Sequence, residues 1–170
     1  MLTDLILGTF ALPLDEEIQQ PISYSELMKR VRSTWKLESQ LSVSSKSGLI
    51  AKGTNKVSRI ERDPKDVAPA KQTPVSELRA EVESQLGIDG KEIDATINFT
   101  FSGMLQDSSN VIDISFQSPT AFLSGSPKVM YLSKLESVKD ASGKTDRHRY
   151  VAVIVKSTVI NVGGWEIKPK

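Results

Sequence analysis

Residues 93–101 read IDATINFTF, and apolar and polar side chains alternate along the whole stretch. An alternation with a period of two places every second side chain on the same face of an extended chain. One face of this segment is therefore apolar and the other polar, which is typical of a strand that covers a core on one side. The apolar face consists of Ile93, Ala95, Ile97, Phe99 and Phe101.

Further strands are expected from this segment to the end of the chain. Residues 111–116 (VIDISF) repeat the alternation, and residues 128–138 (KVMYLSKLESV) predict a third strand. Residues 149–157 (RYVAVIVKS) are apolar on both faces, which predicts a strand buried between two layers. Short strands separated by polar turns indicate a β-sandwich or a small barrel. We expect a mainly β protein, an antiparallel β-sandwich with one or two short helices.

A first helix is predicted within residues 21–35 (PISYSELMKRVRSTW). Ser23 and Glu26 have the spacing of a capping box, in which each side chain satisfies a free backbone N–H of the first turn. Apolar residues recur at four-residue intervals, which is typical of one face of a helix. They are Leu27, Val31 and Trp35.

A second helix is expected over residues 75–86. Thr73 would cap this helix, Pro74 would occupy its first position and Gly87 would end it. Its apolar stripe would consist of Leu78, Val82 and Leu86.

The N-terminal part of the chain predicts a separate unit. The apolar run 5–12 favours a strand over a signal peptide, because Asp4 stands where a signal peptide carries positive charge. Residues 35–62 predict a hairpin around the turn SSKSG, and residues 63–74 contain three prolines that indicate an extended connector. We expect residues 1–74 to form a docking arm with a short helix and a hairpin, and residues 75–170 a helix plus β-sandwich domain.

Composition excludes several classes of partner. The 22 basic and 21 acidic residues leave no net field that would attract nucleic acid. The chain has no cysteine, which excludes disulfides, thiol nucleophiles and cysteine-bound zinc. It also has no apolar run of about 18 residues, so we expect no membrane span.

No set of residues indicates catalysis. The single histidine, His148, could act as a general acid or base, but its neighbours Arg147 and Arg149 favour a solvated histidine in a turn. The acidic groups 15–17 and 61–63 lie in polar segments, where exposed turns explain them better than a catalytic pair. The sequence contains no phosphate-binding loop, metal-ligand spacing or nucleophile elbow. We therefore expect a protein that is not an enzyme and needs no cofactor.

The two tryptophans allow two interpretations. An exposed indole ring can stack on a sugar, and it is also enriched at protein interfaces. Packing in the core or at a sheet edge is the alternative, and we favour it for Trp35. For Trp165, which follows two glycines, both interpretations stay open.

Residues 111–167 resemble the H-type lectin domain. The matching positions are Ile114, Phe116, Pro119, Pro127, Val129, Leu135, Val151, Val153, Gly164 and Trp165. The resemblance implies a six-stranded antiparallel sandwich that forms trimers or stacked trimers, with sugar sites near the subunit boundaries. Such domains occur in agglutinins and in phage tail and fibre proteins. The family continues with a sugar-binding segment that has no counterpart before Lys170, and Arg149 is the one residue that we would carry over as a sugar contact.

These observations predict a structural protein of a homo-oligomeric assembly, a trimer by the resemblance. Its most plausible setting is a bacteriophage virion, as a tail, fibre, baseplate or capsid decoration protein that is assembled in the host cytoplasm and contacts other virion proteins. The alternative is an oligomeric lectin or host-receptor adhesin that binds a glycan, and a small hydrolase comes third. The residues expected to anchor the interface are Phe10, Trp35, Leu78, Val82, Phe116, Tyr131 and Trp165, and Arg149 is the expected polar contact.

Overall fold

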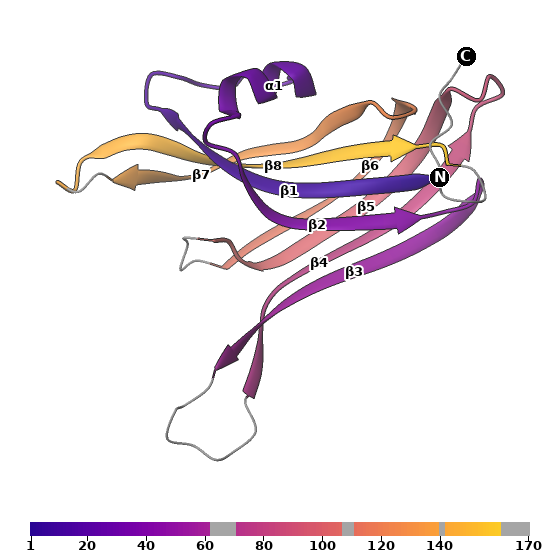
Figure 1. The fold of residues 1–170 in the computed structure, drawn as a ribbon. Helices are drawn as coiled ribbons and strands as arrows, with labels where there is room; N and C mark the ends of the chain where they lie inside the picture. The colour runs from indigo at the N-terminus through magenta and orange to yellow at the C-terminus, as the bar shows by residue number, and fades with distance from the viewer. Residues whose placement is uncertain (62–70, 107–110, 140–141, 161–170) are drawn as a thin grey trace.

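The computed structural model describes residues 1–61, 71–106, 111–139 and 142–160. These residues form two four-stranded antiparallel sheets and one helix (Figure 1). Sheet A has the strand order β2-β1-β8-β7 and sheet B the order β3-β4-β5-β6. The elements are β1 (Leu2–Pro13), α1 (Tyr24–Val31), β2 (Lys36–Ser44), β3 (Leu49–Glu61), β4 (Lys71–Leu86), β5 (Glu92–Met104), β6 (Val111–Leu123), β7 (Pro127–Lys139) and β8 (Thr145–Thr158). The predicted fold class, a mainly β antiparallel sandwich, is confirmed.

The main core lies between the two sheets. The apolar face predicted for residues 93–101 points into it, and all five of its side chains are at most 5% exposed. Three rings from different strands stack through the core: Phe116 lies 5.1 Å from Phe99 and 6.0 Å from Tyr131, measured between ring centroids. The stack joins β5 and β6 of sheet B to β7 of sheet A.

Sheet A is buried on both of its faces. Its inner face packs on sheet B, and α1 covers part of its outer face through a second apolar cluster (Figure 1). Consecutive residues 149–155 of β8 are all buried, as the sequence predicted for a strand between layers. The cluster under α1 contains Phe10, Leu12, Leu27, Val31, Leu132, Tyr150 and Ala152.

The first predicted helix is present. The Ser23 side chain accepts a hydrogen bond of 3.2 Å from the backbone N–H of Glu26, which caps the first turn. Leu27 and Val31 are fully buried, while Trp35 lies beyond the end of the helix. Trp35 stacks on Phe10 with ring centroids 6.1 Å apart.

The second predicted helix is wrong, because residues 71–86 form β4, the longest strand. The apolar residues Leu78, Val82 and Leu86 lie four positions apart. On a strand, residues four positions apart also lie on the same face, so this spacing fits a strand as well as a helix. The buried Ala80 and Ser84 complete a period of two, and charged residues occupy positions between them. Burial of this alternating face against sheet A outweighs the helix propensity of the Glu, Leu, Arg and Ala residues.

The predicted hairpin over residues 35–62 is also wrong. Both strands exist, but β2 belongs to sheet A and β3 to sheet B, so the turn between them crosses from one layer to the other. A Cβ atom added to Gly53 on β3 would lie 2.9 Å from Val43 and 3.1 Å from Leu41 on β2. The two strands therefore pack face to face instead of pairing.

The N-terminal segment is an integral part of the sandwich. β1 pairs with β2 on one side from Leu2 to Thr9, and with β8 on the other side over its whole length from Leu2 to Pro13. Residue 74, the predicted domain boundary, falls inside β4. Strands from both sides of that boundary share both sheets, so the first 74 residues do not form an arm that is separate from the sandwich.

Candidate functional site

The candidate site consists of the four edge strands of the sandwich. β2 and β3 form the edges on one side, and β6 and β7 form the edges on the other (Figure 1). β2 lies over β3 and β4, and β6 contacts β7 and β8, so each side presents two strand edges together. We refer to them as the β2/β3 edge and the β6/β7 edge.

Exposed apolar side chains gather on these edges. In the part of the chain that the structure describes, six of the eight exposed large apolar residues belong to edge strands. Long, exposed, apolar edge strands are templates for pairing with another chain. The six residues are Leu37 on β2, Leu49, Ile50 and Val57 on β3, and Val111 and Leu123 on β6.

The strand directions allow each sheet to continue into a second copy. Every pair of neighbours within a sheet is antiparallel, and each sheet has four strands. The two edge strands of one sheet therefore run in opposite directions. If β6 of one copy met β3 of the next, the alternation would continue unbroken, and the same holds for β7 and β2.

Apolar residues on opposite edges also lie at matching heights. In sheet B, one row of paired residues runs through Val57, Ser76, Gly103 and Ile112, next to Val111. In sheet A, another row runs through Leu37, Gly8, Ala152 and Leu132. Copies placed side by side at the same height would thus bring apolar residues together in both sheets.

Hydrogen bonds fasten the two layers at the end where the chain crosses between them. The N-terminal amino group donates to the Ser45 carbonyl at 2.6 Å, and the hydroxyls of Ser45 and Ser84 lie 2.6 Å apart. On the other side, the N–H of Gly125 donates to the Ser157 carbonyl at 2.8 Å. These contacts tie the two turns that cross between the sheets, β2–β3 and β6–β7, to neighbouring strands.

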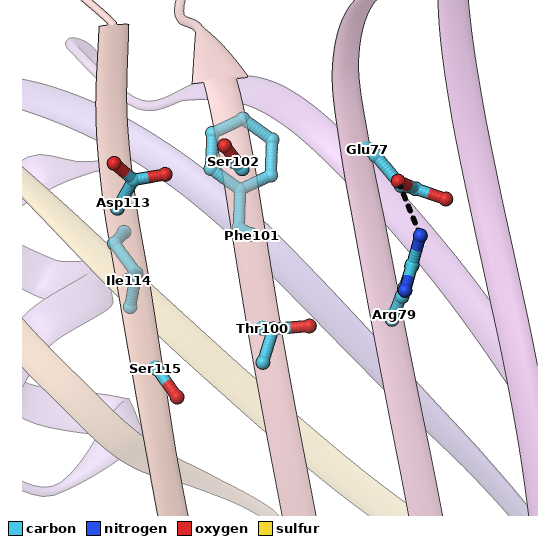
Figure 2. Close-up of a pocket in the computed structure, with 8 residues that line it drawn as sticks. All are labelled: Glu77, Arg79, Thr100, Phe101, Ser102, Asp113, Ile114 and Ser115. Atoms are coloured by element: carbon cyan, nitrogen blue, oxygen red, sulfur yellow. Dashed lines mark hydrogen bonds and ion pairs between the residues drawn. The ribbon is translucent and has the colours of Figure 1, made fainter.

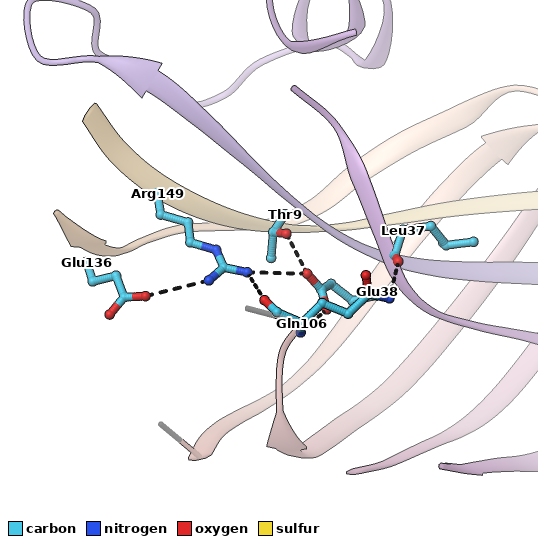
Figure 3. A network of polar contacts seen from close by, with 6 residues as sticks. All are labelled: Thr9, Leu37, Glu38, Gln106, Glu136 and Arg149. Carbon is cyan, nitrogen blue, oxygen red and sulfur yellow. Dashed lines mark hydrogen bonds and ion pairs between the residues drawn. The ribbon is translucent and has the colours of Figure 1, made fainter. Parts of the chain in front are cut away.

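A buried polar network fastens the layers further along the sandwich (Figure 3). Glu38 on β2 accepts hydrogen bonds of 2.6 Å from the Thr9 hydroxyl and from the backbone N–H of Gln106, which follows β5. Arg149 on β8 pairs with Glu38 at 3.5 Å, donates to the Gln106 carbonyl and lies 3.6 Å from Glu136. The Arg149 and Glu38 side chains are 10% and 2% exposed, so this ion pair is shielded from solvent.

The outer face of sheet B is polar and carries a shallow hollow of about 370 Å³ (Figure 2). Glu77 lies beside this hollow between two cations, with Arg79 at 2.8 Å and Lys56 at 3.0 Å. Arg79 and Lys56 hold the pKa of Glu77 below its usual range. The rest of the lining consists of the polar residues Thr100, Ser102, Ser115 and Asp113 and the apolar residues Phe101 and Ile114.

The structure separates the predicted interface residues instead of bringing them to one surface. Phe10 is buried under α1, and Trp35 and Tyr131 are half-buried in the two apolar clusters. Arg149 is engaged in the interior network, so its guanidinium is not presented to a sugar. Leu78 and Val82 are fully buried core residues and Phe116 is half-buried, whereas Trp165 lies outside the described residues.

The single histidine lies in a strand of sheet A. His148 lies in β8, not in a turn, and its Nδ1 is 3.3 Å from the Ser137 hydroxyl. Among the described residues no group of three or more His, Cys, Asp or Glu side chains could hold a metal ion. Nor does any helix in the described ranges have the length and apolar character needed to cross a membrane.

Sequence reasoning missed the edge strands as a site. The sequence predicts a hairpin for the residues of β2 and β3 and strands of the sandwich for those of β6 and β7, but the order of strands within the sheets cannot be read from alternation. One signal was available: Leu49 and Ile50 are adjacent apolar residues, and the strand that they begin is otherwise polar. An alternating strand can bury only one of two such neighbours.

The sequence matches no family model and no curated protein. Solved structures that resemble the fold include the type III secretion injectisome secretin InvG of Salmonella, with 9% identity, a TM-score of 0.45 and coverage of 95% of this chain and 61% of that chain. The type IV competence pilus secretin PilQ of V. cholerae has 9% identity, a TM-score of 0.45 and coverage of 94% and 57%. The type II secretin GspD of enteropathogenic Escherichia coli has 11% identity, a TM-score of 0.43 and coverage of 95% and 66%. The chain thus spans about three fifths of the length of these structures.

These comparisons correct the functional predictions. The similar solved structures named above are bacterial secretion and pilus secretins, not bacteriophage tail, fibre, baseplate or capsid proteins and not lectins. The predicted virion component, its location in the virion and the alternative of a lectin or adhesin are therefore wrong. The resemblance of residues 111–167 to the H-type lectin domain was not tested and stays a prediction.

Proposed function

We propose that this protein is a structural subunit without catalytic activity, which assembles head to tail with copies of itself. In this assembly the β6/β7 edge of one subunit pairs with the β2/β3 edge of the next, and both sheets continue across every contact. The observation that carries the proposal is the concentration of exposed apolar residues on edge strands whose directions permit this continuation.

A closed ring is the expected form. A contact between two different surfaces of the same subunit propagates, and it ends only when the rotation between subunits closes a circle. Closure pairs every edge strand, whereas a single subunit leaves four of them exposed. Polar contacts inside the sandwich support this role, because they stabilise the packing of the two sheets on each other. The two edge strands on each side, β2 with β3 and β6 with β7, then stay next to each other.

The test is the mass of the full chain in solution, measured by light scattering after size exclusion, for the wild type and three lysine variants. Ile50→Lys and Val111→Lys place a charge on opposite edges, and each is expected to reduce the mass to that of one subunit while circular dichroism keeps its β signal. Ile88→Lys is the matched control: Ile88 is fully exposed but lies in the turn between β4 and β5, so its variant should assemble like the wild type. A monomeric wild type would overturn the proposal.

The number of subunits and any ligand remain predictions. The lectin resemblance implied three subunits, and the same mass measurement decides that number. A glycan array with the assembled protein tests the predicted glycan.

A further inference from the structure

The register of the contact between subunits follows from residue rows that cross sheet B from edge to edge. These rows are defined by the pairing of β3 with β4, β4 with β5 and β5 with β6. They relate each outward-facing residue of β3 to one of β6. In this way Ile50, Lys52, Thr54 and Lys56 correspond to Pro119, Gln117, Ser115 and Asp113.

The row that contains Lys56 and Glu77 has opposite charges at its two ends when Arg79 of the neighbouring row is included; Figure 2 shows Glu77, Arg79 and Asp113. At the β3 end, Lys56 and Arg79 both pair with the single carboxylate of Glu77, which leaves one net positive charge. At the β6 end, the row passes through Ser102 and finishes at the exposed carboxylate of Asp113. The β3 edge of one copy is therefore positive at this height, and the β6 edge of another copy is negative there.

We infer that adjacent subunits pair β6 with β3 in the register that places Asp113 of one copy opposite Lys56 of the next. This inference rests on the proposed head-to-tail assembly. The same register places Ser115 opposite Thr54, and Ile112 opposite Val57 on the inner face. Charges of opposite sign that face each other across a contact fix register and suppress alternatives.

Other registers match the two edges less well. A shift by one residue would turn outward side chains of one strand toward inward side chains of the other, so allowed registers differ by steps of two. A shift by two residues in one direction would place Asp113 opposite Thr54. A shift by two residues in the other direction would place it two positions past Lys56 on β3. A shift by four could pair Asp113 with Lys52, but Lys56 would then lie beyond Val111, where β6 begins, and the ladder would be shorter.

Disulfide cross-linking tests the register directly, because the chain contains no cysteine of its own. The variant with both Thr54→Cys and Ser115→Cys is oxidised and examined by denaturing electrophoresis without reductant. Within one subunit these positions lie on opposite edges, about 14 Å apart at a strand spacing of about 4.8 Å, so a disulfide between them must join two chains. The control variant carries Thr54→Cys and Gln117→Cys, a pair displaced by two residues in the inferred register.

The expected result is a ladder of covalent multimers for Thr54→Cys with Ser115→Cys, at a yield several-fold above that of the displaced pair. If the protein assembles but the displaced pair links at least as well, or if neither pair links, the register is overturned while the assembly stands. If light scattering shows a single subunit, the proposed function itself fails and the register fails with it.

Charge reversal gives a second, independent readout. Asp113→Lys is expected to weaken assembly about twofold to fivefold in the apparent dissociation constant, the range of exposed charge pairs. Asp94→Lys makes the same charge change on the inner strand β5 and should leave that constant unchanged. Adding Lys56→Asp to Asp113→Lys should restore part of the loss. Equal effects of Asp113→Lys and Asp94→Lys would contradict the inferred pair.

Discussion

At the scale of single residues, the fold depends on a few positions where the identity of one side chain decides the packing. Gly8 on β1 lies directly beneath the indole ring of Trp35: a Cβ atom at this position would be 2.1 Å from Trp35 Cζ2. The ring lies beside Phe10, so the missing side chain of Gly8 makes room for aromatic packing under α1. Glycine is required here by close approach, not by backbone conformation.

Gly8→Ala should therefore lower the free energy of unfolding by about 1–3 kcal/mol, because the indole ring must move out of its place. The measurement is urea unfolding at a fixed protein concentration, since assembly makes stability depend on concentration. In a Trp35→Leu background the same substitution should cost clearly less. An equal cost in both backgrounds would show that the ring is not what excludes the side chain.

The buried ion pair makes a second prediction at this scale. Arg149→Met leaves the Glu38 carboxylate buried without its closest cation, which should cost about 3–5 kcal/mol of stability. Arg147→Met, two residues away, removes a side chain that is 55% exposed and should change stability by less than about 1 kcal/mol. Thermal unfolding of the two variants separates the cases, and similar losses would contradict the shielded pair.

At the scale of elements, β4 shows how far the sequence could predict the fold. Alternation in residues 93–101 and in β8 predicted strands that the structure contains, because both their period and their β-branched and aromatic residues agree. In β4 the two signals disagree: the residues favour helix, and a stripe at every fourth position fits both periods. Packing against sheet A favours the strand over the helix for β4, and the residues of sheet A that make this contact are distant in sequence.

Glu83→Thr tests this account of β4. Glu83 is exposed on the outer face, between Ile50 on β3 and Thr96 on β5. Threonine is favoured on a strand and disfavoured in a helix, so the substitution should raise the free energy of unfolding by up to about 1 kcal/mol. A lower urea midpoint would instead fit a helix, where threonine costs about 0.5 kcal/mol relative to glutamate.

The crossing from β2 to β3 and the four edge strands could not be predicted for a different reason. Alternation predicts a strand, but the same pattern describes a hairpin and a crossing between layers. The choice depends on Gly53, whose missing side chain lets Leu41 and Val43 of the other layer approach. The candidate site could not be predicted for the same reason. Whether a strand lies at an edge depends on the order of strands in its sheet, and alternation does not give that order.

At the scale of the whole molecule, the sandwich is expected to fold as one unit. A fragment of residues 75–170 lacks β1 and therefore exposes one edge of β8, whose residues 149–155 are buried in the full chain. We expect this fragment to be unfolded or aggregated, with no cooperative thermal transition. A soluble fragment with such a transition would instead support the division at residue 74 that the sequence predicted.

The central claim is that subunits meet head to tail, and mixing two edge variants tests it most directly. Ile50→Lys blocks the β2/β3 edge and leaves the β6/β7 edge free, and Val111→Lys does the opposite. Each variant alone should be monomeric by light scattering, and an equimolar mixture should form a complex of one chain of each. If one variant alone stays dimeric, or if the mixture stays monomeric, the subunits do not join through these two different edges.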